Sequence, residues 1–264
     1  MLVRTWNVFH GNASPPERRA FLEQMVQLVV ADGPDVVCLQ ELPVWSLQRL
    51  AAWSGLRTAS DVTERPLLGS AELGRVITEL HHGLIRSAFT GQANGVLVAP
   101  GFTIAEHRAV VLNPWSFRRR VSRQLRLTLG QRIRWRQHRR VCQVLRLSRG
   151  GKTFVLGNLH ASSLDDKRIT DAELLRAAAF ADGFARPGEP IVLAGDFNVT
   201  AGSSRALAEL AGSEWELQGA TASGIDHILA RGLHGGAATR WPVERRTLDG
   251  RVLSDHAPVE RELA

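Results

Sequence analysis

Short apolar runs that stop abruptly at a polar residue recur along this chain, and they constrain its fold more than any other feature. Such runs lead into Asn7, Glu41, His160 and Asp196. Apolar runs of roughly four to eight residues are typical of buried strands, whereas helices need longer periodic segments. We therefore expect strands at residues 2–9, 35–39, 95–99, 141–147, 153–159, 191–194, 225–230 and 256–262.

Segments with helical spacing of apolar residues separate several of these runs. One helix is expected to open at Ser14-Pro15-Pro16-Glu17, because Ser14 is a capping residue and Glu17 completes a capping box. Further helices are expected near residues 44–54, 70–89, 168–184 and 203–211. A chain that mixes strands and helices in this way predicts layered sheets with helices outside them.

The chain reads as one soluble globular domain over residues 1–264. Apolar residues make up 44% and charged residues 22% of the 264 positions, and no long polar linker divides them. No run of 18 apolar residues predicts a membrane span, and no signal peptide is visible, so we expect a cytoplasmic location unless a signal has been removed. Cys38 and Cys142 lie in apolar runs and are expected to be reduced core thiols. Nothing in the sequence indicates a protein partner.

The charge balance points to an anionic partner. The net charge is +7, and because Lys152 and Lys167 are the only lysines, 31 of the 33 basic residues are arginines. Arginine binds phosphate through two parallel hydrogen bonds, which lysine does not. No acidic residue occurs between His107 and Leu164. A compositional bias of the genome is the alternative explanation for the arginine content.

Within that stretch, an arginine-rich insertion is expected at about residues 115–140. Leu125, Leu127 and Leu129 alternate with polar residues, and the alternation resumes at Ile133 and Trp135. This period favours a two-stranded ribbon, and a helix through 117–127 is the competing interpretation. We expect the basic residues to follow a nucleic-acid backbone, although a solvated basic face is the simpler alternative. The arginines concerned are Arg126, Arg132, Arg134, Arg136, Arg139 and Arg140.

Polar side chains at the expected strand ends form the candidate site. Asp196 and Asn198 are two residues apart, so they lie on the same side of an extended segment. Singly, each such residue is more often a cap or a turn residue. Together they supply carboxylates, amides and histidines, and hard oxygen donors suit Mg²⁺, Mn²⁺ or Ca²⁺ better than zinc. His10, the His81-His82 pair and His234 lie outside these segments.

Six short motifs in this order resemble those of the endonuclease/exonuclease/phosphatase superfamily, whose members include deoxyribonuclease I and inositol polyphosphate 5-phosphatases. The resemblance covers nearly the whole chain. It implies an α+β fold, a four-layer sandwich of two packed mixed β-sheets flanked by helices. The matching segments are Trp6-Asn7-Val8, Leu39-Gln40-Glu41, Asn158-Leu159-His160, Gly195-Asp196-Phe197-Asn198, Ile225-Asp226-His227-Ile228 and Ser254-Asp255-His256.

The resemblance also implies a metal site. Glu41 would ligate the principal metal, with Asn7 beside it and Asp255 nearby. Mg²⁺ or Mn²⁺ is the expected ion, with Ca²⁺ as an alternative.

The remaining motif residues would carry the catalytic roles that the resemblance implies. His256 would face the scissile phosphate, held in its tautomer and charge by Asp226. Asp196 would position or deprotonate the attacking water, and Asn198 would hold phosphate or water. His160 would donate to a non-bridging phosphate oxygen.

The substrate class is narrowed by what the motifs lack. The chain has no tyrosine, and Glu41-Leu42-Pro43 replaces the Glu-Thr-Lys that often follows the metal carboxylate in the abasic-site branch. Ala222-Ser-Gly-Ile-Asp226 differs from the corresponding inositol 5-phosphatase segment. The leading expectation is a metal-dependent nuclease that acts on DNA or RNA with low base selectivity. The alternative is a phosphatase or phosphodiesterase acting on a lipid headgroup, an inositol phosphate or another small phosphate ester. A third, a catalytically inactive binding module, fits an intact motif set poorly.

Overall fold

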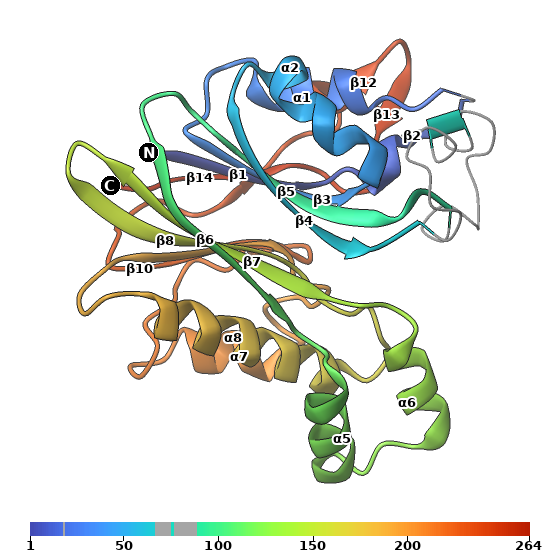
Figure 1. Cartoon of the computed structure of the whole chain (residues 1–264), viewed down its shortest axis with the longest axis vertical. Helices are drawn as coiled ribbons and strands as arrows, with labels where there is room; N and C mark the ends of the chain where they lie inside the picture. Colours follow the sequence, from blue (N-terminus) through green and yellow to red (C-terminus); the bar gives the residue numbers. More distant parts are fainter. Residues whose placement is uncertain (18, 67–74, 77–88) are drawn as a thin grey trace.

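Two β-sheets form the centre of the molecule (Figure 1). The computed structural model describes residues 1–17, 19–66, 75–76 and 89–264. The first sheet has six strands, in which β1 and β3 are parallel and the other neighbours are antiparallel. Its spatial order is β11 (Thr239–Arg240), β14 (Val259–Glu262), β1 (Leu2–Asn7), β3 (Val36–Leu42), β5 (Gln92–Val98) and β4 (Arg57–Glu64).

The second sheet has five strands and includes the expected hairpin of β7 and β8. Strands β8 and β9 are parallel, and the remaining pairs are antiparallel. The spatial order is β10 (Asp226–Arg231), β9 (Ile191–Asp196), β8 (Lys152–His160), β7 (Val141–Arg149) and β6 (Thr103–Val111).

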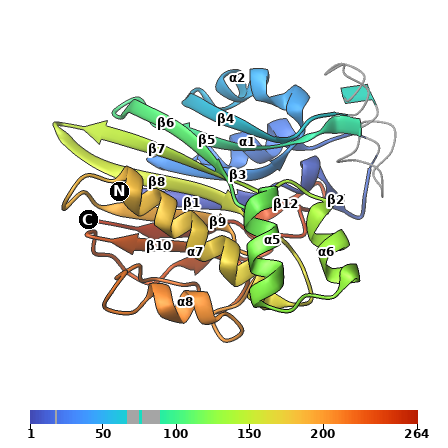
Figure 2. The same cartoon turned by 60° about the horizontal axis from the view of Figure 1, so that its bottom comes forward.

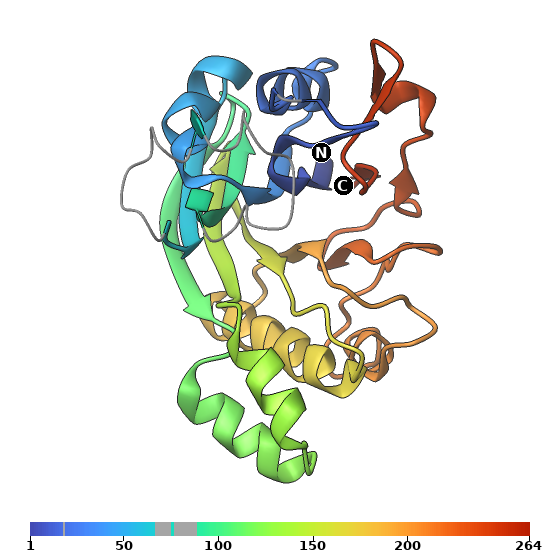
Figure 3. The same cartoon turned by 90° about the vertical axis from the view of Figure 1, so that its right-hand side faces the viewer.

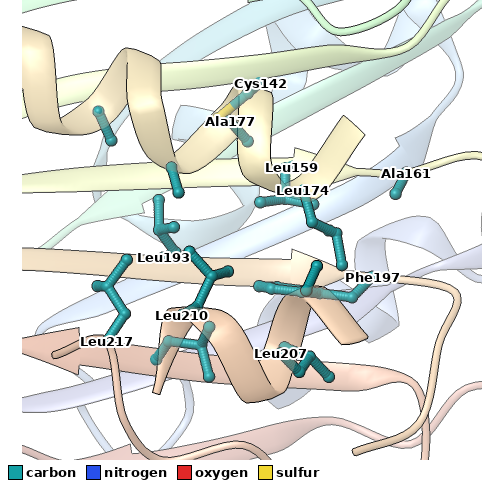
Figure 4. Packing of buried hydrophobic residues seen from close by; sticks show 14 of the residues in the cluster. Cys142, Leu159, Ala161, Leu174, Ala177, Leu193, Phe197, Leu207, Leu210 and Leu217 are labelled. Atoms are coloured by element: carbon teal, nitrogen blue, oxygen red, sulfur yellow. The ribbon is translucent and has the colours of Figure 1, made fainter. Parts of the chain in front are cut away.

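Along the buried strands, successive apolar side chains point to opposite faces of the sheet and so contribute to the core on both faces. In β9, Val192 and Ala194 face the first sheet, whereas Ile191 and Leu193 face the helices on the other side. Successive side chains of a strand point to opposite faces, so one buried strand serves two apolar layers. Figure 4 shows Leu193 among the side chains of the outer layer.

Helices cover the outer face of each sheet. On the first sheet lie α1 (Leu22–Val30) and α2 (Leu50–Ser54), which follows the 3-10 helix Val44–Arg49. On the second lie α7 (Lys167–Phe184) and α8 (Arg205–Leu210). The order helix, sheet, sheet, helix confirms the expected four-layer sandwich (Figure 1).

Two further helices replace the expected arginine-rich ribbon, so that prediction is wrong. They are α5 (Trp115–Gln124) and α6 (Leu129–Arg136), and they project below the second sheet (Figure 3). A capping box between Thr128 and Gln131 begins α6. Leu127 is buried while Leu129 is 73% exposed, so the alternating leucines do not share the single face that a strand would give them.

Other expectations near the N-terminus and in the middle of the chain need correction. Ser14 does not cap a helix, because its backbone pairs with Val252 in a small sheet of β2 (Ala13–Ser14), β13 (Arg251–Leu253) and β12 (Thr247–Leu248). Strands β4 and β6 were not expected from the sequence. The expected helix at 70–89 falls almost entirely outside the described residues. Cys38 and Cys142 are buried free thiols, as expected.

A buried polar network joins the two sheets behind the strand ends. The side-chain amide of Asn158, in β8, donates to the carbonyl oxygens of Leu39 and Gly95 at 3.2 and 2.9 Å. The amide of Gln40 donates to Asn158 Oδ1 at 2.8 Å and to Thr5 Oγ1 at 3.0 Å. These bonds fix the sheets relative to one another at the level of the motif residues. Along the described ranges, no helix is long and apolar enough to cross a bilayer.

Candidate active site

The ends of five strands bring the motif residues together. His160, Asp196 and Asp226 stand side by side in the second sheet, because Asp196 pairs with His160 on one side and with Asp226 on the other. In the first sheet Asn7 pairs with Gln40, which places it beside Glu41. Each sheet therefore supplies one half of the site.

Left-handed backbone conformations occur at the motif residues. Glu41, Asn198 and Ser254 have φ of 56°, 55° and 57°. At Glu41 the pairing of β3 with β5 also shifts register, which turns this side chain away from the regular strand alternation. Gly195 has φ of 144°, and a Cβ there would lie 1.9 Å from the carbonyl oxygen of Leu159. Only glycine fits in front of Asp196.

An acidic centre lies where the two sheets meet. The amide nitrogen of Asn7 donates to Glu41 Oε1 at 3.1 Å and to Asp196 Oδ2 at 3.0 Å. Burial, followed by the negative charge of Asp226, raises the pKa of Asp196 to about 7, although the charge of His256 and the Asn7 hydrogen bond oppose this. Burial and the neighbouring carboxylate together thus favour the protonated form of Asp196.

His256 and Asp226 form a hydrogen-bonded pair on one side of this centre. His256 Nδ1 lies 2.9 Å from Asp226 Oδ2, and His256 Nε2 lies 3.8 Å from Asp196 Oδ2. Burial lowers the pKa of His256, but the hydrogen bond and charge of Asp226, with the charges of Asp196 and Asp255, raise it to about 10. His256 is therefore a cation held by Asp226. The indole N–H of Trp6 donates to the His256 carbonyl and fixes its backbone.

His160 lies on the other side of the centre, against a buried arginine. Its Nε2 is 3.5 Å from Asp196 Oδ2 and 3.7 Å from Glu41 Oε1. Arg140 Nη1 lies 3.1 Å from His160 Nδ1 and 3.2 Å from Nε2, so the guanidinium packs against the ring. Burial, followed by the positive charge of Arg140, holds the pKa of His160 well below its usual range. His160 is thus neutral.

Two further residues of the site, His10 and Lys167, lie outside the sequence motifs. His10 Nε2 lies 3.6 Å from Glu41 Oε2, so this histidine, expected outside the site, is part of it. Its φ of 54° in the turn after β1 aims it there, and no local pattern predicts that conformation. Lys167, at the start of α7, donates to the Asn198 carbonyl at 3.2 Å. His234 is exposed, and the His81-His82 pair lies outside the described residues.

Asn198 lies within the site, whereas Asp255 stands at its edge. The backbone N–H of Asn198 donates to Asp196 Oδ1 at 3.0 Å, and its side chain donates to the Ala161 carbonyl at 2.9 Å. Asp255 is exposed, with its Oδ1 3.4 Å from Ser254 Oγ. Its negative charge nonetheless reaches His256, whose pKa it helps to raise.

The six arginines expected at a nucleic-acid interface lie in different parts of the structure. Arg126 lies between α5 and α6, and Arg132, Arg134 and Arg136 lie on α6. Arg139 donates to the carbonyls of Val62 and Thr63, and Arg140 belongs to the site beside His160.

The side chains at the centre fit a divalent cation. Among the described residues, Asp196, Asp226 and His256 bring one ligand atom each within 4.8 Å of one another. His256 is protonated and bound to Asp226, so it is a poor ligand. The carboxylates of Glu41 and Asp196 flank the Asn7 side chain and supply hard oxygen donors. A cation there would also offset the charge that raises the pKa of Asp196.

A four-layer sandwich that carries an acidic centre between a neutral histidine and a histidine–carboxylate pair defines a phosphoester hydrolase. The sequence profile of the Endonuclease/Exonuclease/phosphatase family matches residues 5–256, and the chain belongs to this family. A comparison with curated protein sequences returned no match.

Several solved structures share the fold along the whole chain at low sequence identity. An endonuclease/exonuclease/phosphatase from Bacteroides vulgatus is 16% identical with a TM-score of 0.68, over 100% of this chain and 98% of that one. The mannosyl-6-phosphatase Bt3783 of Bacteroides thetaiotaomicron is 19% identical with a TM-score of 0.63, over 100% and 99%. The human Nocturnin catalytic domain, which carries a bound sulfate anion, is 15% identical with a TM-score of 0.67, over 100% and 94%.

Proposed function

We propose that this protein is a divalent-metal-dependent phosphodiesterase. The observation that carries the proposal is the His256–Asp226 pair, whose Nδ1 and Oδ2 atoms lie 2.9 Å apart while Nε2 faces the acidic centre. A protonated imidazole aimed at this centre donates to a phosphate oxygen and offsets the negative charge that develops there in the transition state. Asp226 keeps the ring oriented and charged.

Asp196 acts on the attacking water. Burial, followed by the charge of Asp226, raises the pKa of Asp196, which makes this carboxylate a better proton acceptor than an exposed one. The backbone of Asn198 binds Asp196 Oδ1, so the other oxygen faces the centre. Asn198, which binds Asp196 through its backbone, is assigned the role of orienting water or phosphate.

Glu41 would hold the metal together with the nearby Asp196 carboxylate, and Asn7, whose amide nitrogen donates to both carboxylates, would keep the two in place. Mg²⁺ or Mn²⁺ suits these oxygen donors, and Ca²⁺ is a third option. When bound, such an ion neutralises charge on the phosphate oxygens. Asp255 is exposed beside His256, and its negative charge helps to keep His256 protonated.

His160 and Arg140 bind the non-bridging oxygens of the phosphate. His160 is neutral, so it has one N–H to donate. Arg140 is 8% exposed, and its Nε has no hydrogen-bond partner among the residues that the structure describes. An anion at this position would satisfy that buried donor. The sulfate bound to the Nocturnin catalytic domain, which shares the fold, is a tetrahedral anion of the same kind.

Nucleic acid is the first substrate class to consider. The net charge of +7 and the arginine-rich segment between His107 and Leu164 favour a polyanion. A metal-dependent nuclease with low base selectivity fits these features. The second class is a lipid headgroup or another small phosphate ester, and exposed apolar side chains among the same arginines favour it: Trp115, Leu129 and Ile133.

A substrate panel tests the proposal. Purified protein is incubated with Mg²⁺ or Mn²⁺ and a small chromogenic phosphodiester, plasmid DNA, single-stranded DNA, RNA, inositol phosphates or phospholipid vesicles. The Asp226→Asn variant is the matched control. We expect metal-dependent cleavage of the chromogenic diester and of one macromolecular class, with a large loss in the variant. Absence of any phosphoester cleavage, or equal cleavage by the variant, contradicts the proposal.

A further inference from the structure

Three large apolar side chains on the α5–α6 pair are exposed to solvent. Trp115, Leu129 and Ile133 are 66%, 73% and 54% exposed, and they are the three most exposed large hydrophobic residues among those described. The α5 helix lies beside α7 (Figure 2). The inner face of the pair is buried, where Phe117 and Trp135 pack with Ile169 of α7. The outer apolar residues therefore do not serve the fold.

Trp115 lines a basic hollow between the two helices, and Leu129 and Ile133 lie on the adjoining face of α6. Leu129, Ile133 and Arg136 are spaced at positions i, i+4 and i+7, so they share one face of α6. Arg136 and Trp115 line a hollow of about 320 Å³, which places the apolar face of α6 next to it. The other charged residues that line the hollow are Arg118, Arg119, Arg123 and Arg132.

Few acidic side chains offset the positive charge of this surface, although the charge of Glu173 acts on Arg118. Within the described residues, Arg134 is the one arginine of α5 and α6 with a carboxylate partner, Asp165 at 3.1 Å. Burial, followed by the nearby charge of Arg136, lowers the pKa of Arg118, so the guanidinium groups repel one another. The Arg119 guanidinium lies 5.3 Å from the ring centroid of Trp115, which leaves it stacked rather than paired with an acid.

Arginine next to exposed tryptophan and aliphatic side chains matches the chemistry of an anionic lipid surface. Basic residues contact lipid phosphates, tryptophan rests at the headgroup level, and leucine and isoleucine enter the acyl boundary. A nucleic-acid backbone would use the arginines and Trp115 but gives Leu129 and Ile133 nothing to bury against.

We propose that the α5–α6 pair docks the protein on an anionic membrane surface. Trp115, Leu129 and Ile133 enter the interface, while the hollow receives phosphate groups of the lipids. The pair ends four residues before Arg140, which touches His160, so docking holds the active site close to the lipid surface. This inference does not depend on which ester the site cleaves.

Vesicle co-sedimentation of the full chain tests the inference. Parent protein is expected to bind vesicles of phosphatidylcholine with phosphatidylglycerol far better than vesicles of phosphatidylcholine alone. Leu129→Ser with Ile133→Ser should weaken binding about tenfold or more. Arg119→Gln, Arg123→Gln and Arg136→Gln together should weaken it roughly a hundredfold at low salt, at about fivefold per arginine.

Matched controls lie elsewhere on the surface. Val243→Ser removes another exposed apolar side chain, and the triple change of Arg49, Arg57 and Arg240 to Gln removes three exposed arginines from the first-sheet side. Both should bind like the parent. Asp226→Asn should also bind like the parent, which separates docking from catalysis. Circular dichroism checks that each variant is folded.

Tryptophan fluorescence provides a second measurement. Anionic vesicles should shift the emission of the parent to the blue, and Trp115→Phe should abolish most of the shift. Equal binding to neutral and anionic vesicles, or binding that both α5–α6 variants leave unchanged, overturns the inference. The inference is also overturned if the parent protein does not bind vesicles but binds DNA or RNA, and the arginine variant loses that binding. That result would assign this surface to nucleic acid.

Discussion

The indole N–H of Trp135 donates a hydrogen bond of 2.6 Å to Glu173 Oε1, and both side chains are buried. The carboxylate of Glu173, in α7, also accepts from the backbone N–H and the hydroxyl of Ser162 at 2.7 and 2.8 Å. Ser162 follows His160 by two residues. One carboxylate thus ties the α5–α6 pair to the segment that leaves the active site.

Replacing Trp135 with Phe should destabilise the protein by about 1–3 kcal/mol, because a buried carboxylate loses one of its donors. The free energy of unfolding from chemical denaturation measures this loss. Trp115→Phe is the control, since that ring is 66% exposed, and it should change stability by less than about 0.5 kcal/mol. Equal effects of the two changes would contradict a stabilising role of the Trp135–Glu173 bond.

The same variant should show a distinctive pH dependence. Burial raises the pKa of Glu173 despite its hydrogen bonds to Trp135 and Ser162. A carboxyl group whose pKa is raised on folding favours the folded state while protonated, so its contribution is lost as pH rises through the raised value. Trp135→Phe removes a bond that favours the charged form and raises the pKa further. The deficit of the variant should therefore be larger at neutral pH than at acidic pH, as denaturation at several pH values would reveal.

His256→Ala and Asp226→Asn should each lower kcat/KM for a chromogenic phosphodiester by roughly 10²–10⁴-fold. The double variant should be little worse than either single one, because the 2.9 Å pair works as a unit. His234→Ala, an exposed histidine, is the control and should retain parental activity. Losses that multiply in the double variant would show that the two residues act separately.

A chelator should abolish activity, and Mg²⁺ or Mn²⁺ should restore it. The parent should also gain thermal stability on adding the metal, since a ligand that binds only the folded state stabilises it. Glu41→Gln should weaken both effects by removing an anionic donor beside Asn7. Glu244→Gln, an exposed glutamate, should leave both intact. Full activity in excess chelator would refute the metal-dependent proposal.

Arg140→Gln should lower kcat/KM by about 10- to 100-fold, through loss of a charge-assisted contact to phosphate. Its effect on stability should be small, because it removes a buried Nε donor that has no hydrogen-bond partner among the described residues but also removes a favourable charge near Glu64 and Glu173. Arg139→Gln, next along the chain and exposed, is the control for charge alone. If the two variants lose activity equally, Arg140 acts only through the general field of the protein.

Most of the candidate site that the sequence could predict consists of residues at strand ends. Asn7, His160 and Asp196 end β1, β8 and β9, and Glu41 is the last but one residue of β3, because a strand that ends at the edge of a sheet delivers its final side chains there. Asp226 instead begins β10, which runs antiparallel to β9 and so starts at the same edge. The four layers follow from the same runs and the helical segments between them.

In the arginine-rich segment the sequence favoured a ribbon over the competing helix through 117–127, because the contacts that select helices join residues distant in the sequence. Leu125, Leu127 and Leu129 fit a strand period over a short stretch that is equally compatible with a loop between helices. What selects the helices is the burial of Trp135 against Phe117 and Ile169, and its bond to Glu173. His10 was missed for a related reason, since its partner Glu41 is far away in sequence.

The Asn158 amide donates to the carbonyls of Leu39 and Gly95 across the interface between the sheets. These bonds affect how the geometry of the active site responds to substitutions elsewhere. A purely apolar interface tolerates small sliding of one layer on the other, whereas directional bonds penalise shear steeply. Glu41 arrives on one layer and Asp196 on the other, and Asn7 spans the gap between their carboxylates. Core substitutions that keep the Asn158 hydrogen bonds can change stability without changing turnover. Stability and turnover can therefore evolve separately.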